Sequence, residues 1–114
     1  MKRLRKTYGC PVELSLDVLD GKWKPVILAR LKDRPLAYGE LRALLPNLSD
    51  KMLTERLKEL EEQGLTARET SPGDSSRLRY GLTMRGETLR PVLQALYDWG
   101  EKAASQFKVQ IKLG

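Results

Sequence analysis

One cysteine and a short run of polar side chains are the residues of this sequence best suited to chemistry. Cys10 follows a basic stretch that holds Lys2, Arg3, Arg5 and Lys6, and it directly precedes a predicted helix. Nearby cations and a helix N-terminus both favour the thiolate, which is the reactive form of cysteine. The sequence thus suggests a thiol sensor at Cys10, with an unreactive side chain packed under the first helix as the alternative.

The remaining side chains argue against an enzyme. The 114 residues include no histidine and one cysteine. Tetrahedral zinc sites need several Cys or His ligands, and Ser–His or Cys–His catalysis needs a histidine. There is also no glycine-rich phosphate loop. We therefore expect no catalytic site, no bound metal and no cofactor.

The charge of the chain favours a polyanionic partner. The formal net charge is +6 and the isoelectric point about 9.6. Residues 1–34 hold nine basic and four acidic groups, and residues 35–64 hold four and six, so the positive charge flanks a slightly negative centre. No apolar run reaches the roughly 18 residues of a membrane span, and no signal peptide pattern is present. We expect a cytoplasmic protein without a membrane partner.

The stretch from Leu48 to Leu65 predicts one helix whose two ends are both encoded. Ser49 is a good N-cap, and Gly64 can adopt the left-handed conformation that ends a helix, with Leu65 folding back on Leu60. Leu53, Leu57 and Leu60 form an apolar stripe along it. The opposite face holds the polar residues Lys51, Thr54, Glu55, Arg56 and Lys58.

The preceding residues predict a partner for this helix. Short helices are expected over residues 12–19 and 23–31, a very short strand over 35–37, and another helix from Tyr38 to Leu45. Pro46-Asn47-Leu48 then forms a three-residue break before Ser49. Two helices joined in this way are a helix-turn-helix candidate, although two antiparallel helices of any small bundle would have the same pattern.

The following residues predict a basic hairpin. Residues 65–70 suit a strand, and residues 71–76 form a turn cluster in which Pro72-Gly73 fits a type II turn. Leu78, Tyr80 and Leu82 then alternate with Arg77 and Arg79, as in a half-buried strand. A helix-turn-helix followed by a basic hairpin is the element order of a winged helix.

A final helical region begins at Thr83 and has a wide apolar strip. Pro91 is either a first-turn residue of a second helix or a kink. Beyond it, Val92, Leu96, Trp99 and Ala103 fall on one face. Such a strip should be buried, either against the first helix or against a second copy of the chain.

These features together resemble a known family. The motifs CPVELSLDVLDGKWKPVILARL, YGELRALLPNLSDKMLTERLKELEEQGL and RYGLTMRG, with the late Trp99-Gly100, are similar to those of HxlR-type transcriptional regulators, distant relatives of the MarR group. The resemblance implies a mainly α (α+β) winged helix-turn-helix fold. Its parts are a basic N-terminal arm (1–9), the winged-helix domain with N- and C-terminal dimerisation helices (10–105), and a C-terminal tail (106–114).

The resemblance also implies a mode of action. The helix from Ser49 would be the recognition helix, residues 71–77 the wing tip, and the first and last helices the dimer interface. A homodimer of this kind reads an inverted repeat in double-stranded DNA, with half-sites about one helical turn apart. Some family members sense oxidants, quinones or aldehydes at a cysteine in the position of Cys10; whether a small-molecule effector exists is unknown.

Two motifs depart from the family pattern. Ala37-Tyr38 stands where many members have Arg-Phe, which removes a candidate phosphate contact. The wing sequence from Ser75 to Tyr80 lacks the two prolines and the acidic residue that are common there. Wing placement and preference for flanking bases are therefore open.

The residues expected to act follow from this assignment. Candidate DNA contacts are Ser49, Lys51, Met52, Thr54, Glu55, Arg56, Lys58, Arg77 and Arg79. Candidate dimer contacts are Val12, Leu16, Val92, Leu96, Trp99 and Ala103. Lys22 and Lys24 are further candidates for phosphate contacts. The alternative for the polar face is a solvated surface with an ion pair such as Glu55–Lys58, and for the two wing arginines it is sheet-surface charge.

The main functional alternative is a winged helix used only for protein–protein contact. Its best support is the acidic end of the central helix, where Glu59, Glu61 and Glu62 gather. The sequence therefore predicts a DNA-binding regulator, and it restricts DNA contact to the first turns of that helix.

Overall fold

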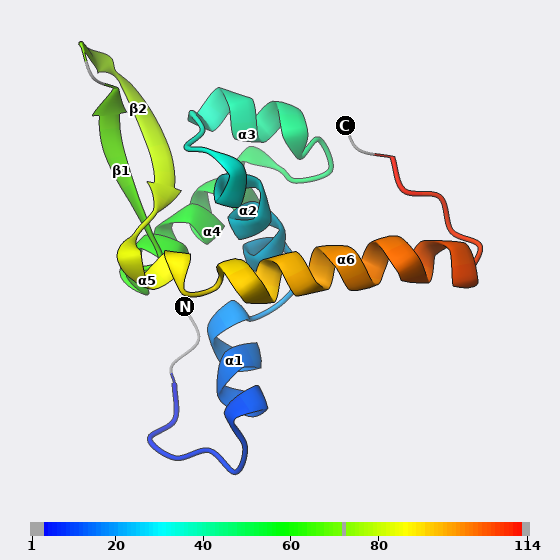
Figure 1. Ribbon diagram of the computed structural model, residues 1–114. Helices are drawn as coiled ribbons and strands as arrows, with labels where there is room; N and C mark the ends of the chain where they lie inside the picture. The colour runs from blue at the N-terminus through cyan, green and yellow to red at the C-terminus, as the bar shows by residue number, and fades with distance from the viewer. Residues whose placement is uncertain (1–3, 72, 113–114) are drawn as a thin grey trace.

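The computed structural model describes residues 4–71 and 73–112. Its elements are α1 (Pro11–Leu19), α2 (Trp23–Asp33), α3 (Tyr38–Leu44), α4 (Asp50–Glu62), β1 (Thr66–Ser71), β2 (Asp74–Leu82), α5 (Met84–Glu87) and α6 (Arg90–Gln106) (Figure 1). This order and the two-stranded antiparallel hairpin confirm the mainly helical winged helix-turn-helix fold.

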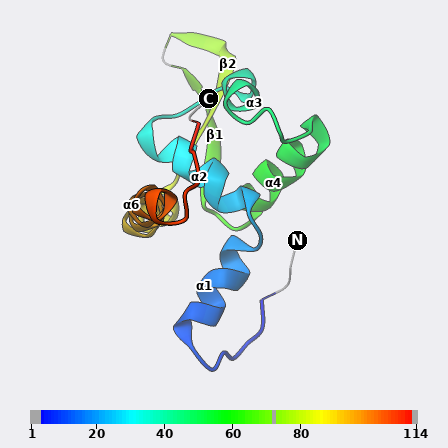
Figure 2. The same ribbon diagram turned by 90° about the vertical axis from the view of Figure 1, so that its right-hand side faces the viewer.

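Helix α2 lies at the centre, between α3, α4 and α6 (Figures 1 and 2). Its Ile27 and Leu28 are fully buried. Burial of each large apolar side chain in this way stabilises the fold by roughly 1.5–3 kcal/mol. The other elements supply the rest of this core, including Leu41, Leu53, Leu57, Leu60 and Leu93.

Both predicted ends of α4 are confirmed. The Ser49 hydroxyl accepts a hydrogen bond from the Met52 amide at 3.1 Å. At the other end Gly64 has a φ of +74°, and the Leu65 amide donates to the Leu60 carbonyl at 2.9 Å. This is the Schellman geometry, which needs a residue that tolerates positive φ. The helix therefore begins and ends where its own sequence specifies.

The short strand predicted over residues 35–37 is a single bridge beside the hairpin. Leu36 exchanges two main-chain hydrogen bonds with Tyr80, at 2.9 and 2.8 Å. Leu36 is also buried in the core. The bridge thus fixes the base of the hairpin to the segment that leads into α3.

The hairpin is longer and its turn shorter than predicted. Ser71 already pairs with Asp74, with an irregularity between Thr70 and Ser71, so the predicted turn over 71–76 is wrong in extent. Gly73 has a φ of +79°, as a tight turn requires, while Pro72 lies outside the described residues. The two strands stay paired beyond the core, because hydrogen bonds between main chains do not require buried side chains beneath them. This pairing leaves fewer residues for the turn.

The predicted burial of the second strand also fails near its tip. Tyr80 and Leu82 pack against the core, but Leu78 is 50% exposed. Figure 1 shows why, because the far half of the hairpin extends beyond the helices. The wing is therefore a half-buried strand only at its base.

Helix α6 begins with Pro91 in its first turn, so the first of the two alternatives for this proline is correct. The preceding α5 is capped by Thr83, whose hydroxyl accepts from the Gly86 amide at 3.0 Å. After α6 the chain reverses at Lys108, which has a φ of +56°. Figure 1 shows the following tail running back above the end of α6.

Candidate nucleic-acid interface

The polar face of α4 is free to meet a ligand along most of its length. Lys51, Thr54, Glu55 and Lys58 are all exposed, because the apolar stripe on the other side is buried. Side chains three and four positions apart share a face of a helix, so these four form one continuous surface. Its width suits the major groove, which accepts an α-helix.

Two further candidates lie on the flank of this face. Met52 is partly buried against the core, and Arg56 is partly buried as well. The Arg56 Nη1 lies 2.5 Å from Glu59 Oε1. Arg56 is therefore held within its own helix, and a DNA contact would have to share or replace the bond to Glu59.

Lys24 lies beneath α4. Its side chain is 1% exposed, and its Nζ lies 3.0 Å from Glu59 Oε2. The expectation that Lys24 contacts a phosphate is wrong, since no phosphate reaches a nitrogen buried in this way. Lys22 instead remains exposed, with its ammonium 4.6 Å from the centre of the Trp23 ring.

The resulting cluster of Lys24, Glu59 and Arg56 joins α2 to α4. Burial disfavours ionisation of Glu59, but the hydrogen bond and charge of Lys24, together with the charge of Arg56, outweigh it and keep the pKa of Glu59 below its ordinary value. Glu59 is thus an ionised group with two cationic partners. The cluster holds the exposed polar face of α4 at a set angle to the central helix α2.

A second cluster joins α4 to α3. Asp50 Oδ1 accepts from the Tyr38 hydroxyl at 2.9 Å and from Arg42 Nε at 2.7 Å. The Tyr38 hydrogen bond, followed by the charge of Arg42, lowers the pKa of Asp50. Arg42 Nη1 also donates to the Leu48 carbonyl. The three-residue turn between the helices is therefore spanned by side chains as well as by backbone.

Arg42 and Asp50 were not among the residues predicted from sequence. The signal was an opposite-charge pair eight residues apart, on either side of the Pro46-Asn47-Leu48 break. Tyr38, noted only as a departure from the family pattern, turns out to bridge to Asp50, and its hydroxyl lies 3.4 Å from Thr54 Oγ1. Tyr38 therefore reaches the edge of the exposed polar face of α4.

The two wing arginines have different surroundings. Arg77 is exposed near the tip of the hairpin, whereas Arg79 is partly buried. The charge of Arg79 contributes to lowering the pKa of Glu40, although a hydrogen bond from the Ala37 amide has the largest effect. Arg77 is thus the more exposed cation, while the charge of Arg79 acts on Glu40 in the first turn of α3.

The acidic end of α4 is largely neutralised within the chain. Glu59 is paired with Lys24 and Arg56, and Glu61 Oε1 lies 3.2 Å from Arg68 Nε. Glu62 is exposed. Two of the three carboxylates that supported a protein-binding surface therefore belong to internal ion pairs.

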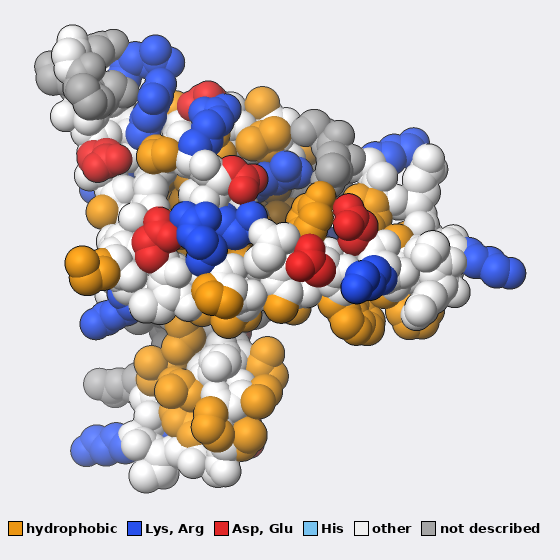
Figure 3. All heavy atoms as spheres, in the orientation of Figure 1, with side chains coloured by type: hydrophobic (Ala, Val, Ile, Leu, Met, Phe, Trp, Pro, Cys, Tyr) orange, Lys and Arg blue, Asp and Glu red, His pale blue; other side chains and the backbone are white. Residues whose placement is uncertain are grey.

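The residues predicted to form a dimer are mostly exposed apolar side chains. Val12 and Leu16 project from α1, and Val92, Leu96 and Trp99 from α6, with Trp99 68% exposed. Figure 3 shows hydrophobic side chains gathered on α1 and along one edge of α6. Ala103 differs, since it is buried within the single chain at 7% exposed.

Cys10 is exposed at the N-cap position of α1. The arm before it contacts α1, because the Tyr8 hydroxyl donates to Asp17 Oδ2 at 2.9 Å. Over residues 4–71 and 73–112, no three His, Cys, Asp or Glu side chains are grouped to hold a metal ion. In the same residues no helix has the length and apolar character needed to cross a bilayer.

Comparison with known proteins agrees with this geometry. The HxlR-like helix-turn-helix family matches residues 18–108. The HTH-type transcriptional regulator YdeP of Bacillus subtilis (strain 168) is 44% identical over 94 residues, which cover 82% of this chain and 73% of YdeP.

Solved structures are similar over comparable lengths. The redox regulator HypR in its oxidized form superposes with a TM-score of 0.74 at 37% identity, covering 82% of this chain and 96% of HypR. Quinone-bound YodB from B. subtilis has a TM-score of 0.66 at 33% identity, covering 82% and 99%.

Proposed function

The chain belongs to the HxlR-like helix-turn-helix family of DNA-binding transcription regulators, and from that premise we propose that it acts as a homodimer on an inverted-repeat operator. The observation that carries this proposal is the free polar face of α4 beside a projecting wing. Relatives of this family are regulators and not enzymes, so the role is binding without catalysis.

In the proposed complex α4 enters the major groove. Lys51 and Lys58 donate to guanine edges or phosphates, and the Thr54 methyl meets a thymine methyl. Glu55 accepts from a cytosine amino group. Ser49 caps the helix, and Met52 and Arg56 contact DNA at the flank of this face.

The wing adds contacts that do not depend on base sequence. Arg77 binds phosphates or enters the adjacent minor groove, as its exposure near the hairpin tip supports. Arg79 is closer to α3 and orients the base of the wing. Neutralised phosphates release counterions, so binding weakens as salt rises.

The dimer forms through the exposed apolar side chains of α1 and α6. A chain of this size gains stability by covering such a strip, and monomeric proteins rarely leave large apolar patches exposed. A two-fold axis through α6 then presents two α4 helices to successive major grooves, roughly 34–36 Å apart.

Selection of bound fragments from random duplex DNA tests this proposal, followed by fluorescence anisotropy on the selected site. We expect an inverted repeat bound with a steep salt dependence. Lys51→Ala should weaken binding by about 5- to 100-fold, the cost of one base contact, while Lys102→Ala on α6 should change it little. Absence of salt-dependent binding to any duplex would instead favour a protein–protein module.

We further propose that Cys10 makes DNA binding responsive to electrophiles or oxidants. Its exposure at the start of α1 supports this, as do the names of the similar HypR, a redox regulator, and YodB, solved in a quinone-bound form. The Cys10 thiolate adds to a quinone carbon and forms a C–S bond, and the ring gains a proton as it becomes a hydroquinone. Alternatively, two Cys10 thiols lose two protons and two electrons to an oxidant and form an intersubunit disulfide.

Mass spectrometry after treatment with benzoquinone or diamide tests this response, with DNA affinity measured in parallel. We expect one adduct per chain, or a disulfide-linked dimer, and an altered operator affinity. Cys10→Ser should abolish both effects. Equal responses of parent and variant would contradict the proposal.

A further inference from the structure

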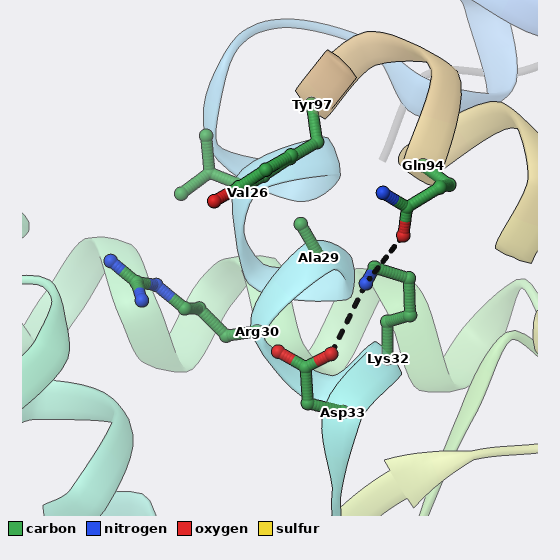
Figure 4. A pocket seen from close by; sticks show the side chains of 7 residues that line it. All are labelled: Val26, Ala29, Arg30, Lys32, Asp33, Gln94 and Tyr97. Atoms are coloured by element: carbon green, nitrogen blue, oxygen red, sulfur yellow. Dashed lines mark hydrogen bonds and ion pairs between the residues drawn. The ribbon is translucent and has the colours of Figure 1, made fainter. Parts of the chain in front are cut away.

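A hollow of about 420 Å³ lies between α2 and α6 (Figure 4). One wall is apolar and consists of Val26, Ala29 and the ring of Tyr97. The polar groups lie at its edge, on the last turns of α2 and on Gln94. This volume is within the range of small-molecule sites, which combine an apolar body with a few polar groups.

Within residues 4–71 and 73–112, only one of the two cations that line the hollow has a partner. Lys32 Nζ lies 3.1 Å from Asp33 Oδ1 and 3.2 Å from Gln94 Oε1. Arg30 is partly buried, and among the described residues no hydrogen bond or ion pair engages its guanidinium. Figure 4 shows Arg30 extending away from the Lys32–Asp33–Gln94 group. With Asp33 counted, the lining has a net charge of +1.

We propose that this hollow binds a small aromatic carboxylate. The ligand carboxylate accepts two parallel hydrogen bonds from Arg30, which is the geometry a guanidinium offers to carboxylates. The ring of the ligand lies against Tyr97, Val26 and Ala29, where offset aromatic contact adds to burial of apolar surface. A neutral ligand of the same shape leaves Arg30 unpaired and binds more weakly.

The position of the hollow keeps it open in the proposed dimer. With about 100° per residue, Gln94 and Tyr97 lie roughly 130° to 170° around α6 from the middle of the exposed apolar strip. A second copy packed on that strip therefore leaves this flank free. The hollow lies between α6 and α2, so a bound ligand would contact both helices. Helix α2 is in turn paired with α4 through Lys24 and Glu59.

Occupancy is therefore expected to change the spacing of the two recognition helices. This consequence rests on the proposed function, whereas the binding of the carboxylate does not. Interfaces with two packings amplify such small shifts.

Isothermal titration calorimetry with benzoate tests the site, with benzamide as the neutral probe of the same shape. We expect benzoate to bind and benzamide to bind at least about 10-fold more weakly. Arg30→Gln should weaken benzoate binding by about 10- to 100-fold, the loss of a charge-assisted pair, and Arg30→Lys by less. Arg34→Gln is the matched control, because Arg34 pairs with Glu40 outside the hollow.

Three outcomes would overturn the proposal: no heat with benzoate at millimolar concentration, equal binding of benzamide, or equal binding by Arg30→Gln. Thermal unfolding of each variant verifies that it is folded. Calorimetry needs no DNA, so a chain that binds benzoate but no duplex would contradict the proposed function alone. A chain that binds its operator but no benzoate would contradict this inference alone.

Discussion

Helices α4 and α6 are both amphipathic, but α4 buries its apolar stripe within its own chain and α6 leaves most of its strip exposed. Leu53, Leu57 and Leu60 of α4 are all in the core, whereas Leu96 of α6 is 55% exposed and Trp99 still more so. A stripe that is already covered leaves the polar face as the free surface of α4. An uncovered stripe makes the apolar face the free surface of α6, which is the surface of the proposed dimer.

The polar sides of the two helices differ as well. Helix α4 is tied to α2 by Glu59 and to α3 by Asp50, so its orientation is set at both ends. The bonds of α6 to α2 are at one end, where Arg90 donates to the Lys32 carbonyl at 2.8 Å and Gln94 accepts from Lys32. The orientation of the α4 polar face is thus set by ion pairs within one chain, whereas the apolar strip of α6 is left largely uncovered by that chain.

The largest expected effect is on stability, which should respond differently to truncation in the apolar stripe of α4 and in that of α6. Leu57→Ala should lower the free energy of unfolding by about 2–5 kcal/mol, because it leaves a cavity in the core. Leu96→Ala should lower it by less than about 1 kcal/mol in dilute, monomeric samples, since that side chain is exposed. Urea unfolding at low protein concentration measures both. Equal losses would show that the stripe of α6 is covered by its own chain.

A slightly smaller effect concerns assembly. Trp99→Asp should weaken dimerisation by at least about 30-fold, the cost of losing one central aromatic contact. Sedimentation equilibrium measures the dissociation constant, and Ser105→Asp on another face of α6 serves as the control. A parent chain that stays monomeric at high concentration would remove the proposed role of α6.

A third effect probes the tie between α4 and α2. Because the pKa of Glu59 is lowered on folding, its pairing stabilises the protein above the ordinary value of 4.5, and this contribution is lost as pH falls through the folded pKa. Glu59→Gln should lower the free energy of unfolding by about 1–3 kcal/mol at pH 7. The variant should also lose less stability than the parent between pH 5 and about pH 3. If parent and variant lose the same free energy of unfolding as pH falls, the pairing of Glu59 with Lys24 does not lower the pKa of Glu59.

The smallest effect belongs to the wing. Arg77→Ala should reduce operator affinity by about 2- to 5-fold at moderate salt, and it should lower the slope of log affinity against log salt by about 1. Anisotropy titrations over a salt series measure both quantities. The same slope for parent and variant would mean that Arg77 touches no phosphate.

The features that were predictable from sequence are local. The ends of α4 are specified by Ser49 and Gly64. The Ser49 hydroxyl accepts from a backbone amide of the first turn, and Gly64 adopts a positive φ because it has no side chain. The extended backbone around Leu36 and the choice of two roles for Pro91 were predictable for the same reason, whereas the pairing of Leu36 with Tyr80 was not. The order of helices and strands then indicated a winged helix.

The errors and omissions concern contacts between segments distant in sequence. Lys24 was predicted at a phosphate and lies under Glu59, because a long side chain can reach a partly buried carboxylate 35 positions along the chain. Leu78 alternates correctly but projects beyond the core. Arg42 and Asp50 pair across a turn whose path was unknown from sequence.

The sequence by itself thus determined the elements, their caps, the family and the polar composition of the α4 face, since these depend on neighbouring residues and on motif order. Only the tertiary structure decided which charges are free. It assigned Lys24, Glu59 and Glu61 to internal pairs and left Lys51 and Lys58 exposed. It also placed Arg30 beside an apolar wall, with no partner among the residues that the structure describes. The physical reason is that the free energy of a charge depends on burial and on its partners, and packing supplies both.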